Sequence, residues 1–561
     1  MICALRWFAA LTFFVTASLA WGEPTTYLPL DNRVYDFLER MEHHWFVSGA
    51  RTGAKPITRS RAADLLVSVN LSKNMLSRAD REELECLLHE FEPDIPSRQG
   101  LVWDDDGPIE RLPGFLRGFV YRNRRNLFST SGSGYSLYID PVIVRSAAVG
   151  TLKTPEKDER VFISSNGFVM RGTAGEHVGF YIDVRDSKEW GSRDYLSPTG
   201  ITTVTTMPGR GYVGFKGDHA EFDETNAGIT YSSGPFVIFY GRGGNIWGRG
   251  KQGTLGLSGY ASPYEMLRIE TVFWRLRYTF LAAEIKQYPP IAEFHYTNPI
   301  GVYSDSVAVH KRLSGHRLEI DINDRLNVGL YETVVYGGRW EMSYLNPVMF
   351  LRGAEHTNGD HDNAVMGADF RLMVHRSHSV YGEFLIDDIT TGKLGTDWYG
   401  NKFGWQIGTF MVEPFRLGDT DARIEYTRIK PWVYTHRYPI NVYDHYGSTL
   451  GYYTGPNSDE LSAEFRKRFT RRLQLSLSWL RYRHGANPSG LNIGGDIKFG
   501  RRSSDPKKSH FLEGIVERRS RVEIDVSYEP AWQLFLRAGC AYEDRDGRAN
   551  RIVRCSLGLN E

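Results

Sequence analysis

From about residue 113 to its last residue, the chain consists largely of short segments in which apolar and polar side chains strictly alternate. The segments 317–322, 473–479 and 522–528 show this most clearly, because Leu, Ile, Val, Trp or Tyr fills every second position. A period of two indicates a β-strand with one apolar and one polar face. Many such strands in an exported chain predict a transmembrane antiparallel β-barrel, apolar outside and polar inside.

The N-terminus has the features of a secretory signal peptide. Arg6 precedes an apolar run over residues 7–15, and the small residues that follow place the cleavage site at 18–20 or 20–22. The apolar run is too short to span a bilayer, so we assign residues 1–20 to a signal peptide rather than to a membrane anchor. No later stretch reaches ~20 consecutive apolar residues, so an exported chain that crosses lipid must do so as a barrel.

Composition alone does not decide between a membrane barrel and a soluble array of β-sandwiches. The net charge of +1 provides no basic field for nucleic acid. The mean hydropathy of −0.39 is typical of a soluble protein, but a barrel shows lipid only every second residue of a strand. The 57 glycines and the 13% of aromatic residues suit tight turns and membrane interfaces.

The region before the alternating segments has a different pattern. Apolar residues follow helical spacing over 34–41, 62–69 and 84–91, which predicts three amphipathic helices. Each helix has one apolar stripe to bury, so we expect the three to form a compact bundle. The expected N-caps are Asp31, Thr58 and Ser77.

These patterns divide the chain into a bundle over residues 21–100, a connector over 101–112 and a barrel over 113–561. From residue 235 onward, short and long connections alternate. The short ones are 232–235, 323–325, 375–377, 470–472 and 529–531, and the long ones are 248–264, 288–312, 338–362, 389–401, 435–457 and 484–510.

Bacterial barrels have short periplasmic turns and long outer loops. The alternation therefore predicts that the bundle and the C-terminus share the periplasmic mouth, in the outer membrane of a Gram-negative bacterium. We expect roughly 18 strands, with 16 to 20 allowed.

The cysteines add little to this interpretation. Cys86 falls among the helical core residues and is expected to be buried and inert. Cys540 and Cys555 lie on the last two expected strands, where symmetry about residues 547–548 could place them opposite each other. A cross-strand disulfide is one alternative in an oxidising compartment, and free thiols are the other.

Several stretches resemble the Wzi family of capsule-assembly outer-membrane proteins. The most specific match is the segment 241–250 followed by Leu255-Gly256-Leu257-Ser258. The other similar stretches are 27–38, 55–59, 344–347, 384–388, 401–404, 431–436 and 455–458. The likeness covers nearly the whole mature chain and keeps its order.

The resemblance implies a barrel whose periplasmic mouth is covered by the helical bundle. It also implies a lectin-like role, in which the protein holds or organises capsular polysaccharide at the cell surface. Outer-membrane lipid and the capsule export machinery are the further partners it implies. No individual binding residue transfers from the family, and no cofactor or metal is implied.

The connection 435–457 has the composition of a sugar-binding surface, since aromatic faces stack on sugar C–H groups and polar side chains bind hydroxyls. An aromatic belt at the membrane interface together with ordinary loop packing is the alternative, favoured by the 31 tyrosines of the chain. The candidate glycan-binding residues are His436, Arg437, Tyr438, Tyr443, Asp444, His445, Tyr446, Tyr452 and Tyr453.

Three further groups of residues invite a functional interpretation. The stretch 355–363 is rich in oxygen ligands but matches no full calcium loop, so a solvated loop is favoured. Asp387 and Asp388 could act as an acid–base pair, although a rim charge or luminal salt bridge is favoured. Trp247 and Arg249 lie in a glycine-rich segment that could fold into the lumen, where a plug is the favoured interpretation.

Motifs for enzymes are absent from the sequence. It contains no H-E-x-x-H, no G-x-S-x-G, no P-loop, no dinucleotide fingerprint and no zinc spacing. Our first hypothesis is a non-catalytic outer-membrane protein that binds exported polysaccharide. The alternatives are a diffusion channel (porin) and an outer-membrane enzyme acting on glycan or lipid.

Overall fold

The computed structural model describes residues 23–47, 49–95, 125–151, 160–191, 206–207, 209–216, 219–287, 292–298, 301–307 and 310–560. The expected signal peptide and the expected connector lie outside these residues. Within them, no helix is both long enough and apolar enough to cross a membrane.

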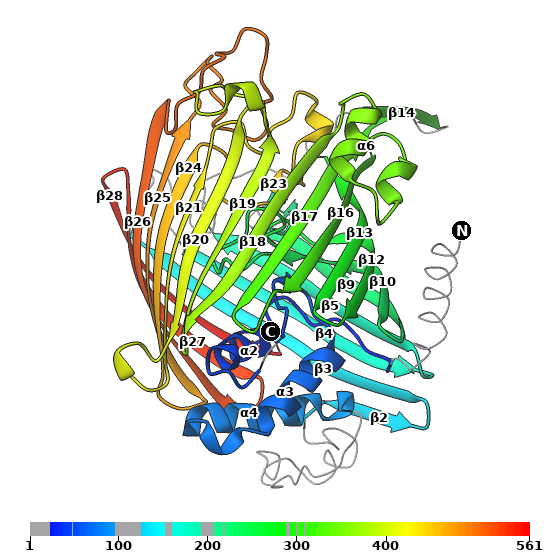
Figure 1. Ribbon diagram of the computed structural model, residues 1–561, viewed down its shortest axis with the longest axis vertical. Helices are drawn as coiled ribbons and strands as arrows, with labels where there is room; N and C mark the ends of the chain where they lie inside the picture. Colours follow the sequence, from blue (N-terminus) through cyan, green and yellow to red (C-terminus); the bar gives the residue numbers. More distant parts are fainter. Residues whose placement is uncertain are drawn as a thin grey trace, which may run out of the picture.

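Eighteen antiparallel strands close into one barrel (Figure 1), which confirms the predicted fold class and strand number. Closure occurs between β28 and β3, where Leu559 pairs with Ile143. The strands, in order around the barrel, are β3 (Tyr135–Gly150), β4 (Arg160–Ala174), β5 (Val178–Gly191), β9 (His219–Ser233), β10 (Phe236–Gly243), β12 (Tyr264–Phe273), β13 (Leu276–Lys286), β16 (His310–Asp321), β17 (Leu326–Gly337), β18 (Asn363–His375), β19 (His378–Asp388), β20 (Lys402–Val412), β21 (Thr420–Ile429), β24 (Ser458–Arg468), β25 (Leu473–Ala486), β26 (Ile515–Ala531), β27 (Leu534–Arg545) and β28 (Arg548–Leu559).

Short strands supplement this ring. β2 (Phe128–Gly132) pairs with the beginning of β3, and β8 (Gly214–Lys216) pairs with β9. Four two-stranded sheets lie in the connections: β1 (Ala54–Lys55) with β11 (Ile246–Trp247), β6 (Thr206–Met207) with β7 (Gly211–Tyr212), β14 (Ala292–Asn298) with β15 (Gly301–Val307), and β22 (Asp444–His445) with β23 (Ser448–Thr449).

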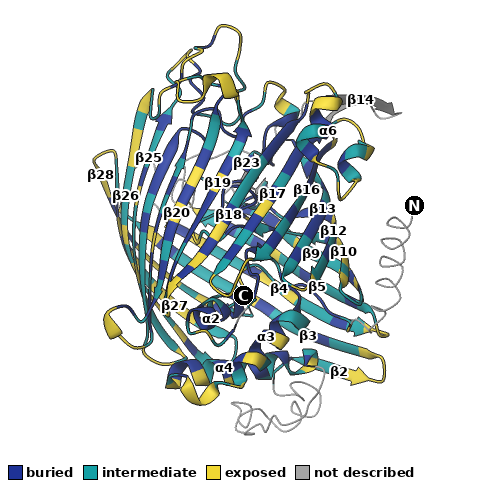
Figure 2. Cartoon of the chain, in the orientation of Figure 1, coloured by how far each residue is buried: buried dark blue, intermediate teal, exposed yellow. Residues whose placement is uncertain are grey.

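The outer and inner faces of the wall follow the predicted alternation. On β26, the four side chains at positions 522, 524, 526 and 528 point outward and are 38–44% exposed. Between them, Glu523 and Asp525 point into the lumen and pair with Arg554 of β28. In Figure 2, exposed residues recur along β26 and β27. The exposed apolar face is the one that a lipid-facing barrel presents.

The lumen is less polar than predicted. Its centre holds an apolar core made of wall and loop residues together, including Trp247, Leu255, Tyr331, Tyr434 and Tyr443. This core exists because long connections fold into the barrel and bury their own apolar side chains against the wall.

The three N-terminal helices gather at the end of the barrel where the strands are joined by short turns, which we call the helical end (Figure 1). They are α2 (Val34–His43), α3 (Arg59–Asn70) and α4 (Arg78–Phe91), with 3-10 turns η1 (Lys73–Met75) and η2 (Glu92–Asp94). Their apolar stripes form one buried cluster that includes Leu38, Met41, Leu66 and Leu88. The opposite end carries the long connections and is called the loop end.

Two of the three predicted helix caps are confirmed. Thr58 accepts a hydrogen bond from the Arg61 N–H at 3.3 Å, and Ser77 accepts one from the Asp80 N–H at 3.1 Å. The third prediction, that Asp31 caps the first helix, was wrong. α2 begins after Arg33, which makes no side-chain cap, and Asn32 Oδ1 instead accepts a hydrogen bond from the first helical N–H at 2.9 Å.

The chain returns to the helical end at its C-terminus, where the Asn560 N–H donates to Gln533 O at 3.0 Å. One predicted turn was misplaced, because residues 529–531 belong to β26 and the turn follows at 532–533. The register of β26 and β27 shifts between Tyr528 and Ala531, so Pro530 lies in an irregular strand end.

The three cysteines that the structure describes do not pair. Cys540 lies opposite Val553 and Cys555 lies opposite Ala538, so the expected alignment was wrong by two residues. The reason is that the turn centres between Arg545 and Arg548, ahead of the assumed position. Both thiols are exposed and free, and Cys86 is half-buried rather than buried.

Arg40 of α2 fastens the bundle to the barrel. Its side chain is almost completely buried, and it donates to Asp80 of α4 at 3.0 Å, to Glu413 at 2.9 Å and to Asp421 at 2.5 Å. Glu413 lies in the turn after β20, and Asp421 lies at the beginning of β21. One guanidinium therefore joins two helices to the wall.

We expect Arg40→Met to loosen the bundle while the barrel persists. Removing one member of a buried ionic cluster costs roughly 3 kcal/mol, because the carboxylates left behind stay buried. Limited proteolysis should cleave within residues 34–91 far faster, while the heat-modifiable mobility of the barrel in SDS gels is unchanged. Arg78→Met is the matched control, since Arg78 forms an exposed ion pair with Glu82 on the surface. Equal protection of both variants would contradict the prediction.

His43 predicts a pH dependence of the same contact. Its Nδ1 lies 2.7 Å from Glu39 O and its Nε2 lies 2.7 Å from Ser379 Oγ of β19. Burial lowers the pKa of His43 from 6.5 to about 4. The unfolded imidazole therefore binds protons first, so docking should weaken by up to roughly 3 kcal/mol as the pH falls from 6.5 to 4.

The measurement for His43 is protease protection of the bundle between pH 7 and 4. Below pH 4.5 the carboxylates contribute as well: burial raises the pKa of Glu39, but the charge of Arg423 lowers it to about 2. His43→Gln serves as the control that isolates the imidazole, because glutamine does not titrate. An identical pH profile for both proteins would exclude this role.

Candidate functional site

The glycine-rich segment around Trp247 lies inside the barrel. β11 pairs with β1, so Trp247 lies opposite Ala54 in the lumen and is completely buried. Arg249 Nη2 donates to Glu319 at 3.2 Å and to Asn327 at 2.9 Å on the wall. At Gly256 an added Cβ would lie 2.7 Å from the ring of Tyr331, so glycine permits the close approach. The segment has the geometry of a plug.

The connection 435–457 also folds inward. Tyr443 stacks on Tyr434 with ring centroids 5.6 Å apart, and its hydroxyl lies 2.9 Å from Thr333 Oγ1 of the wall. Asp444 forms a buried ion pair with Lys311. His445 Nδ1 accepts a hydrogen bond from the Lys286 N–H at 2.8 Å. These side chains are committed to internal contacts.

Two more of the predicted glycan-binding residues, His445 and Tyr452, are buried and bonded inside the barrel. Burial lowers the pKa of His445 to about 3, so the ring stays neutral as the acceptor of that bond. The Tyr452 hydroxyl donates to Glu460 at 2.7 Å. Arg437 and Tyr438 are exposed, and His436 is half-buried beside them. The Arg437 guanidinium lies 5.0 Å above the Tyr438 ring.

An aromatic cavity of about 370 Å³ opens at the loop end, and we call it the loop-end cavity. It lies between the connection 435–457, the end of β25 and the connection that follows it. The side chains that give it its chemical character are Tyr260, Tyr446, Tyr453, Tyr482, Phe499, His484, Asn487, Asp496, Lys498 and Glu517.

The ring planes of the loop-end cavity are fixed by neighbouring contacts. Tyr260 and Tyr453 lie with ring centroids 5.9 Å apart, and the Tyr453 hydroxyl bonds to Glu460. His484 is held by Glu517 at 2.9 Å and by Gly495 O at 2.7 Å. The rings of Tyr453 and His484 are therefore preorganised.

Other polar groups of the loop-end cavity remain available. The hydroxyls of Tyr260, Tyr446 and Tyr482 and the ammonium of Lys498 form no side-chain hydrogen bond with any residue that the structure describes. Burial raises the pKa of Tyr260 to about 12, so its hydroxyl remains a donor at neutral pH. Rings with free hydroxyls beside a cation can bind a polar, ring-shaped ligand.

Tyr446 and Tyr453 are the two predicted glycan-binding residues that line the loop-end cavity. Tyr482 and His484 were missed, although the alternation of β25 contained the signal. Leu473 to Trp479 occupy odd positions on the outer face, so the even positions 482 and 484 must face the lumen. The contributions of Tyr260 and Phe499 depend on loop folding, for which the sequence holds no comparable signal.

The other predicted residues take part in structural contacts. Asp387 Oδ1 lies 3.1 Å from Lys402 Nζ, and Asp387 also accepts from the Tyr434 N–H at 2.5 Å. Asp388 pairs with Arg352 at 3.4 Å. The two carboxylates therefore have separate partners, as a salt bridge and a rim charge do. The stretch 355–363 begins within the helix α6 (Leu351–Thr357).

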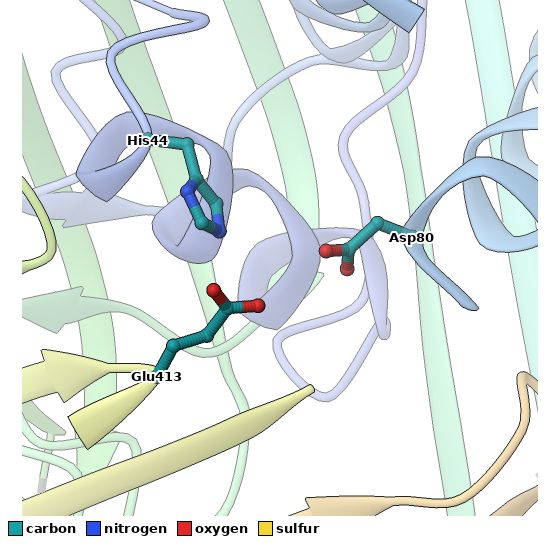
Figure 3. A group of neighbouring side chains, drawn as sticks. All are labelled: His44, Asp80 and Glu413. Carbon is teal, nitrogen blue, oxygen red and sulfur yellow. The ribbon is translucent and has the colours of Figure 1, made fainter. Parts of the chain in front are cut away.

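Within the described part of the chain, the group of side chains that could together hold a metal is His44, Asp80 and Glu413, with ligand atoms within 4.8 Å of one another. Figure 3 shows these side chains converging at the helical end. Arg40 already supplies a positive charge to both carboxylates. Burial, followed by the charge of Arg40, lowers the pKa of His44. The cluster fits an ionic contact better than a cation site.

Comparison with solved structures shows a likeness in fold. A Wzi structure from Escherichia coli, described as a carbohydrate-binding β-barrel involved in group 1 capsule assembly, has a TM-score of 0.57 at 13% sequence identity. That match covers 95% of this chain and 99% of the other.

Two other solved structures match less well. OprD from Pseudomonas aeruginosa has a TM-score of 0.40 at 11% identity, covering 75% of this chain and 92% of that one. OccAB1 from Acinetobacter baumannii has a TM-score of 0.41 at 11% identity, covering 75% and 96%. Among curated protein sequences, none matches this chain.

The sequence also matches a family model. The model describes the capsule assembly protein Wzi, and the match extends over residues 127–546, which is most of the chain and most of its barrel. The resemblance found in the short sequence segments is thereby confirmed: the chain belongs to the Wzi family of capsule assembly proteins.

Proposed function

We propose that this protein is an outer-membrane lectin that binds and organises exported capsular polysaccharide at the cell surface. Family membership supports the link to capsule assembly. The single observation that carries the binding role is the loop-end cavity, where aromatic faces and free hydroxyls line one opening. The proposed ligand is polysaccharide delivered by the capsule export machinery.

The proposed orientation places the helical end in the periplasm and the loop end outside the cell. Short turns at one end and long connections at the other support it. We propose the corresponding division into a signal peptide, a periplasmic bundle over 21–100, a connector over 101–112 and a barrel over 113–561. Polysaccharide would then meet the loop-end cavity from the outside.

The chemistry of the loop-end cavity suits a sugar better than a lipid or an apolar ligand. Tyrosine rings offer apolar faces to sugar C–H groups, and their hydroxyls replace bonds that the sugar makes to water. Lys498 adds a cation that can pair with an acidic sugar. The proposed mechanism is capture without turnover, because binding requires no covalent step.

The binding site can be tested by point substitution, because deleting residues 435–457 would remove part of the luminal core. We expect Tyr446→Ala with Phe499→Ala to weaken binding of purified capsular polysaccharide roughly tenfold, since each stacking ring contributes about 0.5–1.5 kcal/mol. Isothermal titration of detergent-solubilised protein measures the change.

The matched control is Tyr438→Ala with Phe415→Ala. Tyr438 lies on the rim outside the loop-end cavity, and Phe415 is exposed in the turn between β20 and β21, at the helical end. These variants also lose two exposed rings, so they should bind as the unmodified protein does. Loss of binding in the control, or unchanged binding in the test variant, would remove the loop-end cavity from consideration.

A channel would require an open lumen, and this barrel contains a plug and an inward-folded connection. We therefore expect planar bilayers to record no steady large openings from the unmodified protein. Replacing residues 246–256 by a short Gly-Ser linker should produce them, because it removes the luminal contacts of Trp247 and Arg249. Steady large openings of the unmodified protein would favour the diffusion channel instead.

A further inference from the structure

One connection at the loop end folds outward rather than inward. It contains η4 (Met342–Leu345) and α6, and joins β17 to β18. In Figure 1, α6 lies on the outside of the barrel, beside β16 and β17. We call residues 339–357 the outer flap.

Strand parity shows which side of the wall the outer flap covers. On β17, Thr333 contacts Tyr443 in the lumen and Val335 belongs to the luminal core. The alternate residues Val334 and Tyr336 therefore point outward. The outer flap packs on these outward residues through Tyr344, Leu351 and Ala354.

Hydrogen bonds hold the outer flap against the wall. The Leu351 N–H donates to Glu332 Oε2 at 2.7 Å, and the Tyr278 hydroxyl of β13 bonds to Pro347 O. His316 Nε2 lies 3.5 Å from the same Glu332 carboxylate. Glu332 and His316 occupy outward positions, where a charged or polar group in contact with lipid is costly. The backbone of the outer flap satisfies part of that polar surface.

The outer flap exposes several large apolar side chains, beside the exposed polar residues Arg339, Asn346 and His356. Trp340 is 56% exposed, Met342 75%, Val348 86% and Phe350 58%. Four large apolar side chains so exposed within one short segment form a patch of the kind that marks an interaction surface. Trp340 also stacks with Arg312, whose guanidinium lies 4.2 Å from the ring.

We propose that the outer flap is an interfacial membrane anchor, which inserts these four side chains into the lipid at the head-group boundary of the outer leaflet. The position of the outer flap favours lipid over a protein partner. It lies on the outer face of the wall, and closer to the helical end the same face of these strands faces lipid. Leu330, which is half exposed on the outer face of β17, belongs to that surface. A tryptophan beside an arginine suits the head-group region.

The anchor also accounts for the position of the polar residues beneath it. The outer flap covers the outward polar residues Glu332 and His316 and exposes large apolar side chains at the same level of the barrel. It thereby continues the lipid-facing surface around β13, β16 and β17. This inference depends on the barrel crossing a membrane, and it is independent of which glycan the protein binds.

Spin labelling tests the proposal in the full-length protein. Cys3, Cys86, Cys540 and Cys555 are replaced by Ser, and single labels are introduced by Met342→Cys or Val348→Cys. Both positions are highly exposed, so labelling removes no buried contact. The proteins are reconstituted into phosphatidylethanolamine–phosphatidylglycerol vesicles, and heat-modifiable mobility verifies the fold. Power saturation compares accessibility to oxygen with accessibility to a water-soluble nickel chelate.

Two control positions calibrate the result. Ile524→Cys labels the lipid-facing wall of β26, and Leu394→Cys labels an exposed leucine in the loop-end connection between β19 and β20. We expect the labels at 342 and 348 to favour oxygen as the label at 524 does. Nickel accessibility like that at 394 would overturn the proposal, because the outer flap would then lie in water. Protection from both reagents would also overturn it, in favour of a protein partner.

Discussion

Closure of the barrel is the constraint on which the rest of the structure depends. Eighteen strands satisfy their backbone hydrogen bonds by pairing in a ring, as lipid demands, but a ring of this size encloses more space than its wall side chains can fill. The chain fills that space with β1, β11 and the connection 435–457. The loop-end cavity is the space left between the inward-folded connection and the end of β25. The proposed binding site therefore exists because a connection folds into the barrel and leaves a cavity beside it.

Charge pairing makes the filling specific. Arg249 of the glycine-rich segment bonds to Glu319 of β16, and Glu42 of α2 pairs with Arg371 of β18. Together with Arg40, these pairs fix the plug and the bundle in one position relative to the wall. A buried pair adds little net stability compared with an apolar contact, but an unmatched partner is strongly penalised. Other positions of the bundle would leave such groups unmatched.

The sequence predicted what depends on local periodicity. Strand parity correctly assigned Ile524 to the outside and Glu523 to the lumen, and helical spacing located α2, α3 and α4. It failed where the outcome depends on distant contacts. Tyr443 and His445 have the composition of a surface site, but they are buried because Thr333 and Lys286, more than a hundred residues away, provide their partners. Parity within β25 also identifies Tyr482, so part of the cavity was predictable.

The composition of a long connection explains whether it turns into the lumen or out toward lipid. The lumen contains carboxylates that need donors, and tyrosine hydroxyls provide them: Tyr331 donates to Glu383 at 2.6 Å and Tyr452 donates to Glu460 at 2.7 Å. A tyrosine-rich connection such as 435–457 therefore gains hydrogen bonds by turning inward. Trp340, Met342, Val348 and Phe350 bring no hydroxyl to such carboxylates, and they gain by leaving water for an apolar medium. Both connections start from the loop end of the barrel. The side chains of the connection 435–457 favour the inner face of the wall, and those of the outer flap favour its outer face.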